Sequence, residues 1–175
     1  MDKKKVRNYQ IFSVIFTFVL GSLLHFTFKL SAENPVVAVF SSVNESTWEH
    51  LKLLFFPMLL TIIIGYFYLG KEKTNFLCAK TIGILASMLF TIIFFYTYTG
   101  ILGKNIAVID ISSFFIAVII GEYLAYRLIN GYFPCNNVIA IIVLIVLTIC
   151  FTIFTFYPPQ ISLFKDPITG TYGII

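Results

Sequence analysis

The stretch VNESTWEHLKLLFFP, residues 43–57, gathers side chains that can do chemistry next to a long apolar run. Its ionisable members are two carboxylates, an imidazole and an ammonium group: Glu45, Glu49, His50 and Lys52. Carboxylates and imidazoles can bind a divalent metal ion or act as general acid and base. The whole chain has only 8 acidic residues and 2 histidines, so this concentration makes the stretch a candidate functional site.

Helical geometry predicts how these side chains would be arranged. At about 100° per residue, Glu45, Glu49 and Lys52 fall within roughly 40° of one another, with Trp48 beside them. Glu49 and Lys52 have the i,i+3 spacing of an ion pair. His50 points about 100° away from Glu49, toward a different neighbour.

Two interpretations of this helix start remain open. In the first it is an ordinary amphipathic helix end, with Asn44 as the cap and acids that suit the helix dipole. In the second, Glu45, Glu49 and His50 converge with His25 to bind a divalent metal, or Glu49 and His50 act in catalysis. No HExxH motif or other closed ligand pattern accompanies these residues.

Composition indicates an integral membrane protein. The chain has 175 residues, of which 59% are hydrophobic and 11% charged, and a mean hydropathy of +0.94. Soluble domains average about 25% charged residues. Five apolar stretches are long enough to cross about 30 Å of hydrocarbon: about 10–30, 51–70, 77–99, 109–129 and 138–157. The sequence therefore predicts an all-α protein, a single domain (1–175) that forms a bundle of five transmembrane helices. The segment PVVAVF, residues 35–40, is too short to span and is expected to form an interfacial or re-entrant turn.

The distribution of basic residues predicts the orientation. With the N-terminus inside, the cytoplasmic side receives Lys3, Lys4, Lys5, Arg7, Lys71, Lys73, Lys80 and Arg127, and the outer side receives Lys29, Lys52, Lys104 and Lys165. Positive charge gathers on the cytoplasmic side of membrane proteins. We therefore expect a multi-pass protein of a bacterial cytoplasmic membrane with its N-terminus cytoplasmic and its C-terminus outside.

This topology gathers the uncommon polar groups at the outer surface, with one exception. His25, residues 43–57, Asp110 and the tail all lie there in the predicted arrangement. Glu122 instead lies within the fourth span, where an ionisable group is costly and needs a partner or a function. Tyr126, at i+4, is the expected hydrogen-bond partner; the alternative is a proton or cation relay.

The C-terminal tail, residues 158–175, is too apolar to lie free and too broken by proline to form a span. Its DPITG segment has turn chemistry, with Asp166 in first position. The tail lies either on the membrane surface or over the outer mouth as a lid. We favour the lid, which would contribute Asp166 and Tyr172 to the site.

The three cysteines show no CxxC spacing. They are Cys78, Cys135 and Cys150. The predicted topology puts the first two at inner helix ends and Cys150 within a span. We expect free thiols, with neither a disulfide nor a zinc knuckle.

Two motifs, VNESTWEHLKL and LFKDPITGTYG, bracket most of the chain. Their combination resembles a functionally uncharacterised family of small multi-pass membrane proteins of Gram-positive anaerobic bacteria. The resemblance implies no activity, and it points to the motif residues Asn44, Glu45, Trp48, Glu49, His50, Asp166 and Gly170.

Three functional hypotheses follow. The first is a protein that binds or moves a small solute or cation through an outward-facing pocket. Its ligand-binding candidates are Asn44, Glu45, Trp48, Glu49, His50, Lys52, Asp110, Glu122, Tyr126 and Asp166. The second is a membrane-embedded hydrolase or transferase, metal-dependent in one version, that acts on a lipid-like substrate. The third is an accessory subunit that docks a partner. The lipid bilayer is the expected surrounding, a homodimer is an open possibility, and no basic patch with stacking aromatics indicates nucleic acid.

Overall fold

The computed structural model describes residues 3–70, 73–131 and 133–174. Its long helices are α1 (Lys3–Leu30), α3 (Thr47–Gly65, continued by the π-helical turn η1, Tyr66–Gly70), α4 (Phe76–Leu102), α5 (Ala107–Asn130) and α6 (Asn137–Phe156). Two short elements, α2 (Pro35–Ala38) and η2 (Ser162–Phe164), lie in the connecting segment and the tail. All 5 long helices are long and apolar enough to cross a membrane, which confirms the predicted all-α fold.

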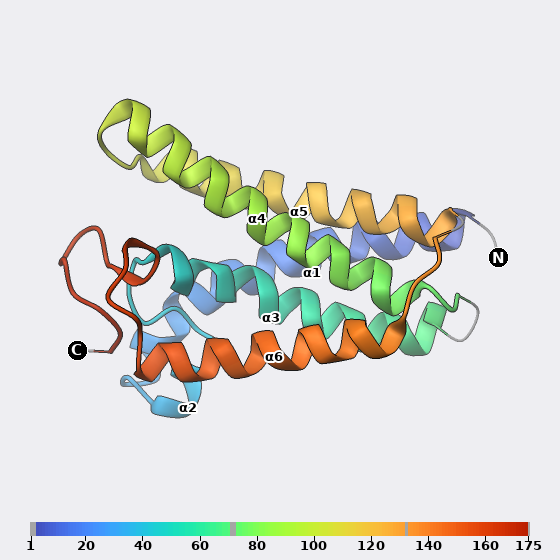
Figure 1. Cartoon of the computed structure of the whole chain (residues 1–175), viewed down its shortest axis with the longest axis horizontal. Coiled ribbons are helices and arrows are strands. Elements are labelled where there is room, and N and C mark those ends of the chain that lie inside the picture. The colour runs from blue at the N-terminus through green and yellow to red at the C-terminus, as the bar shows by residue number, and fades with distance from the viewer. Residues whose placement is uncertain (1–2, 71–72, 132, 175) are drawn as a thin grey trace.

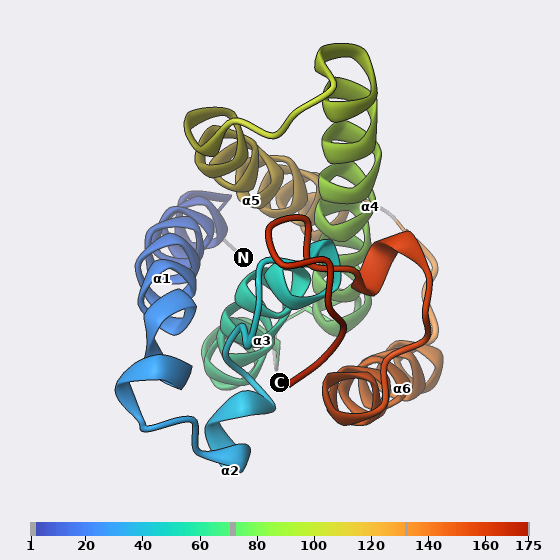
Figure 2. The ribbon, with the colours of Figure 1, turned by 90° about the vertical axis from the view of Figure 1, so that its left-hand side faces the viewer.

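Helix α3 lies at the centre of the bundle (Figures 1 and 2). It packs against α1 and α4 and, more lightly, against α6, while α5 pairs with α4 and α1. The two chain ends lie at opposite ends of the bundle (Figure 1), as five crossings require. We call the end that holds the end of α1, the start of α3 and the C-terminal tail the site end; the predicted orientation places it outside.

An aromatic cluster holds the site end together. Trp48 of α3 packs against Phe151 of α6 and Phe164 of η2, with ring centroids 4.5 and 4.9 Å apart. Phe55, about two turns further along α3, also packs on Phe151, with ring centroids 5.0 Å apart. Burying aromatic rings of this size stabilises the contacts between α3, α6 and the tail.

The start of α3 differs from the prediction. Ser46, not Asn44, is the N-cap, and its hydroxyl accepts a hydrogen bond from the Glu49 amide. Asn44 instead accepts a bond from the Ser46 amide and donates one to the carbonyl of Gly173. Glu45 therefore precedes the helix, and helical spacing does not govern where its side chain points.

The partner of Glu122 is also different from the one expected. Its carboxylate oxygens each lie 2.6 Å from Lys80 Nζ, and the Ser13 hydroxyl donates to the same carboxylate at 2.7 Å. No bond to Tyr126 forms among the described residues. Lys80, which the prediction placed on the cytoplasmic side, is fully buried. Lys71, counted on the same side, lies outside the described residues.

The cysteine prediction was wrong for one pair. Cys78, in the first turn of α4, and Cys135, just before α6, form a disulfide with a Cα–Cα separation of 6.2 Å. Although 57 positions separate the two cysteines, α4 and α6 begin side by side at the end of the bundle opposite to the site end. Cys150 is free, as expected.

The tail folds back over the start of α3. Lys165 and Tyr172 form an isolated antiparallel bridge that closes the DPITG turn. Asp166 is buried and accepts hydrogen bonds from the amides of Ile168 and Thr169 through one oxygen, and from the Glu45 amide through the other. The turn thus lies beside the candidate site and is bonded to one of its residues.

Candidate functional site

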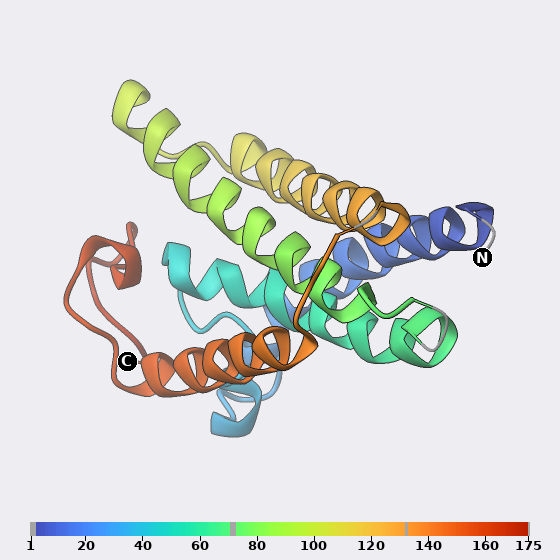
Figure 3. The same cartoon turned by 45° about the vertical axis from the view of Figure 1, so that its right-hand side comes forward.

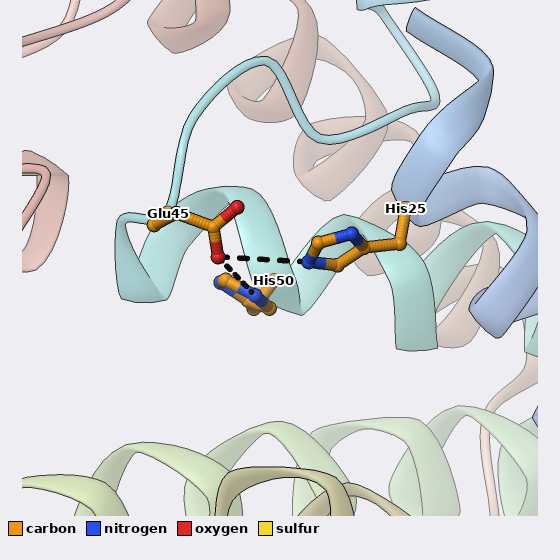
Figure 4. A group of neighbouring side chains, drawn as sticks. All are labelled: His25, Glu45 and His50. Carbon is orange, nitrogen blue, oxygen red and sulfur yellow. Dashed lines mark ion pairs between the residues drawn. The ribbon is translucent and has the colours of Figure 1, made fainter. Parts of the chain in front are cut away.

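Three side chains from three segments meet at the site end. They are His25 near the end of α1, Glu45 in the connection that leads to α3, and His50 in the first turn of α3 (Figure 4). One oxygen of Glu45 lies 3.6 Å from His25 Nε2 and 3.4 Å from His50 Nε2. Each side chain is about one third exposed, so the cluster is open to solvent while being held by the fold.

The connection between α1 and α3 positions Glu45. Ser41 donates to the carbonyl of Leu24 and accepts from the Phe28 amide, which ties the connection to the end of α1. Further along, the Glu45 amide donates to Asp166, as described above. The backbone of Glu45 is thereby held between α1 and the tail, and its carboxylate faces both histidines.

The spacing of the three side chains is that of metal ligands. Their ligand atoms all lie within 4.8 Å of one another. Ligands about 2.1 Å from a tetrahedral ion lie roughly 3.4 Å apart. The two distances from Glu45, 3.6 and 3.4 Å, are already close to this value. The donor set, two imidazoles and one carboxylate, suits zinc and similar divalent ions.

The two imidazoles differ in their support. His50 Nδ1 lies 2.9 Å from the backbone carbonyl of Ser46, so the proton sits on Nδ1 and Nε2 presents a lone pair toward Glu45. In metal sites, a ligating histidine commonly donates its other ring N–H to a backbone carbonyl in this way, which fixes the ring. His25 Nδ1 is buried and bonds with no described residue. The His50 ring is therefore fixed in orientation, while that of His25 is free to adjust.

The cluster also keeps its carboxylate ionised. The hydrogen-bonding approach of His25 lowers the pKa of Glu45 below its ordinary value, and the charges of His50, His25 and Lys29 act in the same direction. Partial burial opposes this effect without overcoming it. A carboxylate that remains charged is the form that binds a metal ion.

A cavity of about 420 Å³ adjoins the three residues. Its polar lining residues are Ser22, His25, Glu45, Thr47, His50, Thr91, Asn105, Asp110 and Ser113. Leu53, Phe95 and Phe114 supply apolar wall. This volume lies within the range of about 300–1,000 Å³ that is usual for small-molecule sites. Asp110 therefore shares a cavity with both histidines, and its carboxylate accepts a hydrogen bond from the Tyr98 hydroxyl.

Glu49 and Lys52 lie elsewhere. They form a buried ion pair at 2.5 Å, and Lys52 Nζ also donates to the Ala38 carbonyl and to Thr155. The Val43 amide donates to Glu49. Neither residue lines the cavity. Their contacts join α2, α3 and α6, so they support the site end without reaching the cluster.

The remaining candidate residues are spread over the fold. Trp48 is part of the aromatic cluster, Asn44 bonds to the tail, and Asp166 reaches Glu45 only through the backbone. Glu122 lies in the buried pair with Lys80, and Tyr126 is half-buried against the core. No sequence pattern indicated Thr47, Thr91, Asn105 or the Ser46 carbonyl, because these ordinary polar groups acquire a role only through tertiary placement.

The fold and the cluster together define a class: a multi-helix, membrane-type protein with a group of two histidines and one glutamate at one end of its bundle. Within that class, a profile of a family of unknown function (DUF6512) matches residues 1–174, and the chain belongs to this family. The match agrees with the resemblance to an uncharacterised family. No curated protein and no solved structure shows a significant match to the chain.

Proposed function

We propose that this protein binds a divalent metal ion of the zinc class through His25, Glu45 and His50, at the mouth of a membrane-embedded cavity. The observation that carries the proposal is the convergence of three ligand atoms from three separate segments within 4.8 Å. An ordinary amphipathic helix start would require no histidine from α1. The proposal belongs to the first of the three hypotheses, a cation in an outward-facing pocket.

A catalytic role is the second candidate, and one observation favours it. Structural zinc sites use four protein ligands, whereas catalytic sites use three and leave a position for water or substrate. Here three ligands face a cavity that also contains Asp110, a group able to accept a proton. Transport along Glu122 is not part of the proposal, because Lys80 and Ser13 already bond its carboxylate.

Metal content of the purified protein tests the proposal. The chain would be purified in detergent, stripped with EDTA, reloaded with zinc, passed over a desalting column and analysed by mass spectrometry for metal. We expect about one ion per chain for the wild type. His25→Ala, Glu45→Gln and His50→Ala should each weaken binding by more than the roughly 100-fold that is lost when a group that only orients a metal ligand is removed.

Glu33→Gln is the matched control, since Glu33 is an exposed carboxylate in the same connection, and it should bind metal as the wild type does. Thermal unfolding of each metal-free variant separates lost ligation from misfolding. A wild type that retains no zinc, or three variants that retain it fully, would contradict the proposal.

A further inference from the structure

The cavity beside the cluster opens sideways at the site end. Phe26 of α1 and Ile111 of α5 both line it, yet they are 60% and 61% exposed. The outer parts of α4 and α5 diverge from α3 toward the site end (Figures 1 and 3). Farther from the site end, α1 and α5 are in contact through Phe18 and Phe115, whose ring centroids are 4.8 Å apart. The opening therefore faces the surroundings of the bundle between the ends of α1 and α5, where lipid lies if the helices span a membrane.

The inner part of the cavity is apolar. Leu53 is 4% exposed, and it lines the cavity together with Phe95 and Phe114. Gly21 completes this part, and a Cβ there would lie 2.4 Å from the Leu53 carbonyl oxygen, so α1 and α3 approach closely at its floor. Burying an alkyl chain against such a wall, away from water, is favourable by about 0.8 kcal/mol of free energy per CH₂ group.

The polar part of the cavity carries two different recognition groups. The cluster of His25, Glu45 and His50 would hold a cation able to accept an anionic oxygen. Asp110 is an acceptor, and it lines the same cavity as His25 and His50. A divalent ion with Glu45 and Asp110 has a net charge of about zero, which suits a head group with both an anionic oxygen and a hydrogen-bond donor.

We infer that the cavity takes a single-chain, phospholipid-like amphiphile, with its phosphate on the metal at His25, Glu45 and His50, its head-group N–H or O–H donor on Asp110, and its acyl chain against Leu53 and Phe114. The inference rests on the proposed function, because the phosphate is bound through the metal. Entry is sideways, between Phe26 and Ile111. The DPITG turn contributes Ile168 to the same cavity, so the tail covers part of the head group.

Two lysophospholipids with the same glycerol hydroxyl, but with N–H or N–CH3 groups on the head-group nitrogen, provide the test. Lauroyl lysophosphatidylethanolamine carries N–H groups, and lauroyl lysophosphatidylcholine carries none. Native mass spectrometry of the detergent-purified protein, loaded with zinc or treated with EDTA, measures the bound fraction of each. Zinc-loaded wild type should prefer the ethanolamine lipid by about tenfold, the worth of one hydrogen bond to a charged group. Asp110→Asn should abolish the preference, and EDTA should reduce the binding of both lipids.

A matched pair on α4 tests the position of the chain. Thr91 lines the cavity, whereas Thr97 is exposed on the same helix and does not line it. Thr91→Phe should fill the cavity and reduce lipid binding by at least about tenfold, a loss of 1.4 kcal/mol or more. Thr97→Phe should bind as the wild type does. Neither substitution touches a metal ligand, so both variants should keep their zinc.

The outcomes separate the two proposals. Zinc binding without lipid binding, or lipid binding that is equal in wild type and Thr91→Phe, overturns the inference and leaves the proposed function intact. Lipid binding that EDTA does not change overturns the assignment of the phosphate to the metal. Absence of zinc from the wild type overturns the proposed function, and the inference with it.

Discussion

Removing one partner of the Lys80–Glu122 pair leaves the other charge in the middle of the helix bundle. Lys80 is 0% and Glu122 is 1% exposed, and Ser13 is the only other polar side chain bonded to the pair among the described residues. Ser13 cannot compensate a full charge. The remaining group must therefore lose its charge in the folded state or remain as an unpaired ion, and neutralisation is the cheaper outcome.

The cost of neutralisation differs between the two single variants. A lysine with an ordinary pKa of about 10.4 costs about 4.6 kcal/mol to deprotonate at pH 7. A glutamate with an ordinary pKa of about 4.3 costs about 3.7 kcal/mol to protonate at pH 7. Glu122→Gln should thus lower the free energy of unfolding by up to about 4.6 kcal/mol, the cost of deprotonating Lys80. Lys80→Met should lower it by up to about 3.7 kcal/mol, the cost of protonating Glu122. Both values agree with the roughly 3–5 kcal/mol measured when a buried pair is broken.

The dependence on pH has opposite signs in the two variants. Folded Glu122→Gln binds one proton fewer than the unfolded chain, because Lys80 is neutral only when folded, so its stability rises by about 1.4 kcal/mol per pH unit near pH 7. Folded Lys80→Met binds one proton more, through Glu122, so its stability falls by about the same amount per unit. The double variant carries no charge at this position and should show neither slope.

Unfolding in detergent with increasing SDS, at several pH values between about 6.5 and 8.5, measures these slopes. Lys104→Met, which removes an exposed lysine between α4 and α5, is the control and should leave stability unchanged. Equal slopes in the two single variants, or single losses below about 1 kcal/mol, would refute the assignment of a charged, mutually dependent pair.

Three further results are expected. Zinc affinity should fall as the pH is lowered, because protons compete with the metal for the imidazole ligands, by up to about tenfold per pH unit for each imidazole, while Glu45 stays ionised because its pKa is lowered; competition with a chelating dye measures this. Asp166→Ala removes the acceptor of the Glu45 amide and should weaken zinc binding by about 10–100-fold in the same assay, with the protein still folded. Ser46→Ala removes the cap of α3 and should cost about 1 kcal/mol in SDS unfolding, and an unchanged midpoint would contradict the capping role.

The number of long helices followed from hydropathy, because crossing a membrane requires long apolar segments. The candidate residues at the site end were identified for a related reason. Polar groups are rare in such a chain, and topology alone brings the ends of consecutive helices to one surface. His25 and His50 could therefore be proposed as neighbours although 25 positions separate them.

The sequence could not predict that Glu45 joins the two histidines while Glu49 pairs with Lys52. Helical spacing places both carboxylates on one face, but this holds only if both belong to the helix. Ser46 begins the helix one position after Glu45, so Glu45 turns toward His25 and Glu49 toward Lys52. Capping by Ser46 and not by Asn44, two positions earlier, decided which acid joined the cluster.

The partner of Glu122 was missed for a different reason. Tyr126 is its neighbour along the helix, whereas Lys80 is 42 positions away and lies near the start of a span, where lysines usually reach the surface. The packing of α4 against α5 explains why Lys80 is the partner of Glu122. Gly83 and Gly121 face each other so closely that a Cβ on either would overlap the other's backbone, and this close approach brings Lys80 to Glu122.

The disulfide between Cys78 and Cys135 affects how α6 is held. At the site end, ring packing and the Lys52–Thr155 hydrogen bond hold α6 against α3. At its other end, the disulfide links α6 to α4, and Asn137 donates a hydrogen bond to the Thr74 carbonyl. The charge distribution predicts that this second end lies in the cytoplasm, where thiols are kept reduced. Reduction of this one cysteine pair would leave that end of α6 held by the Asn137 hydrogen bond and by its packing on α4.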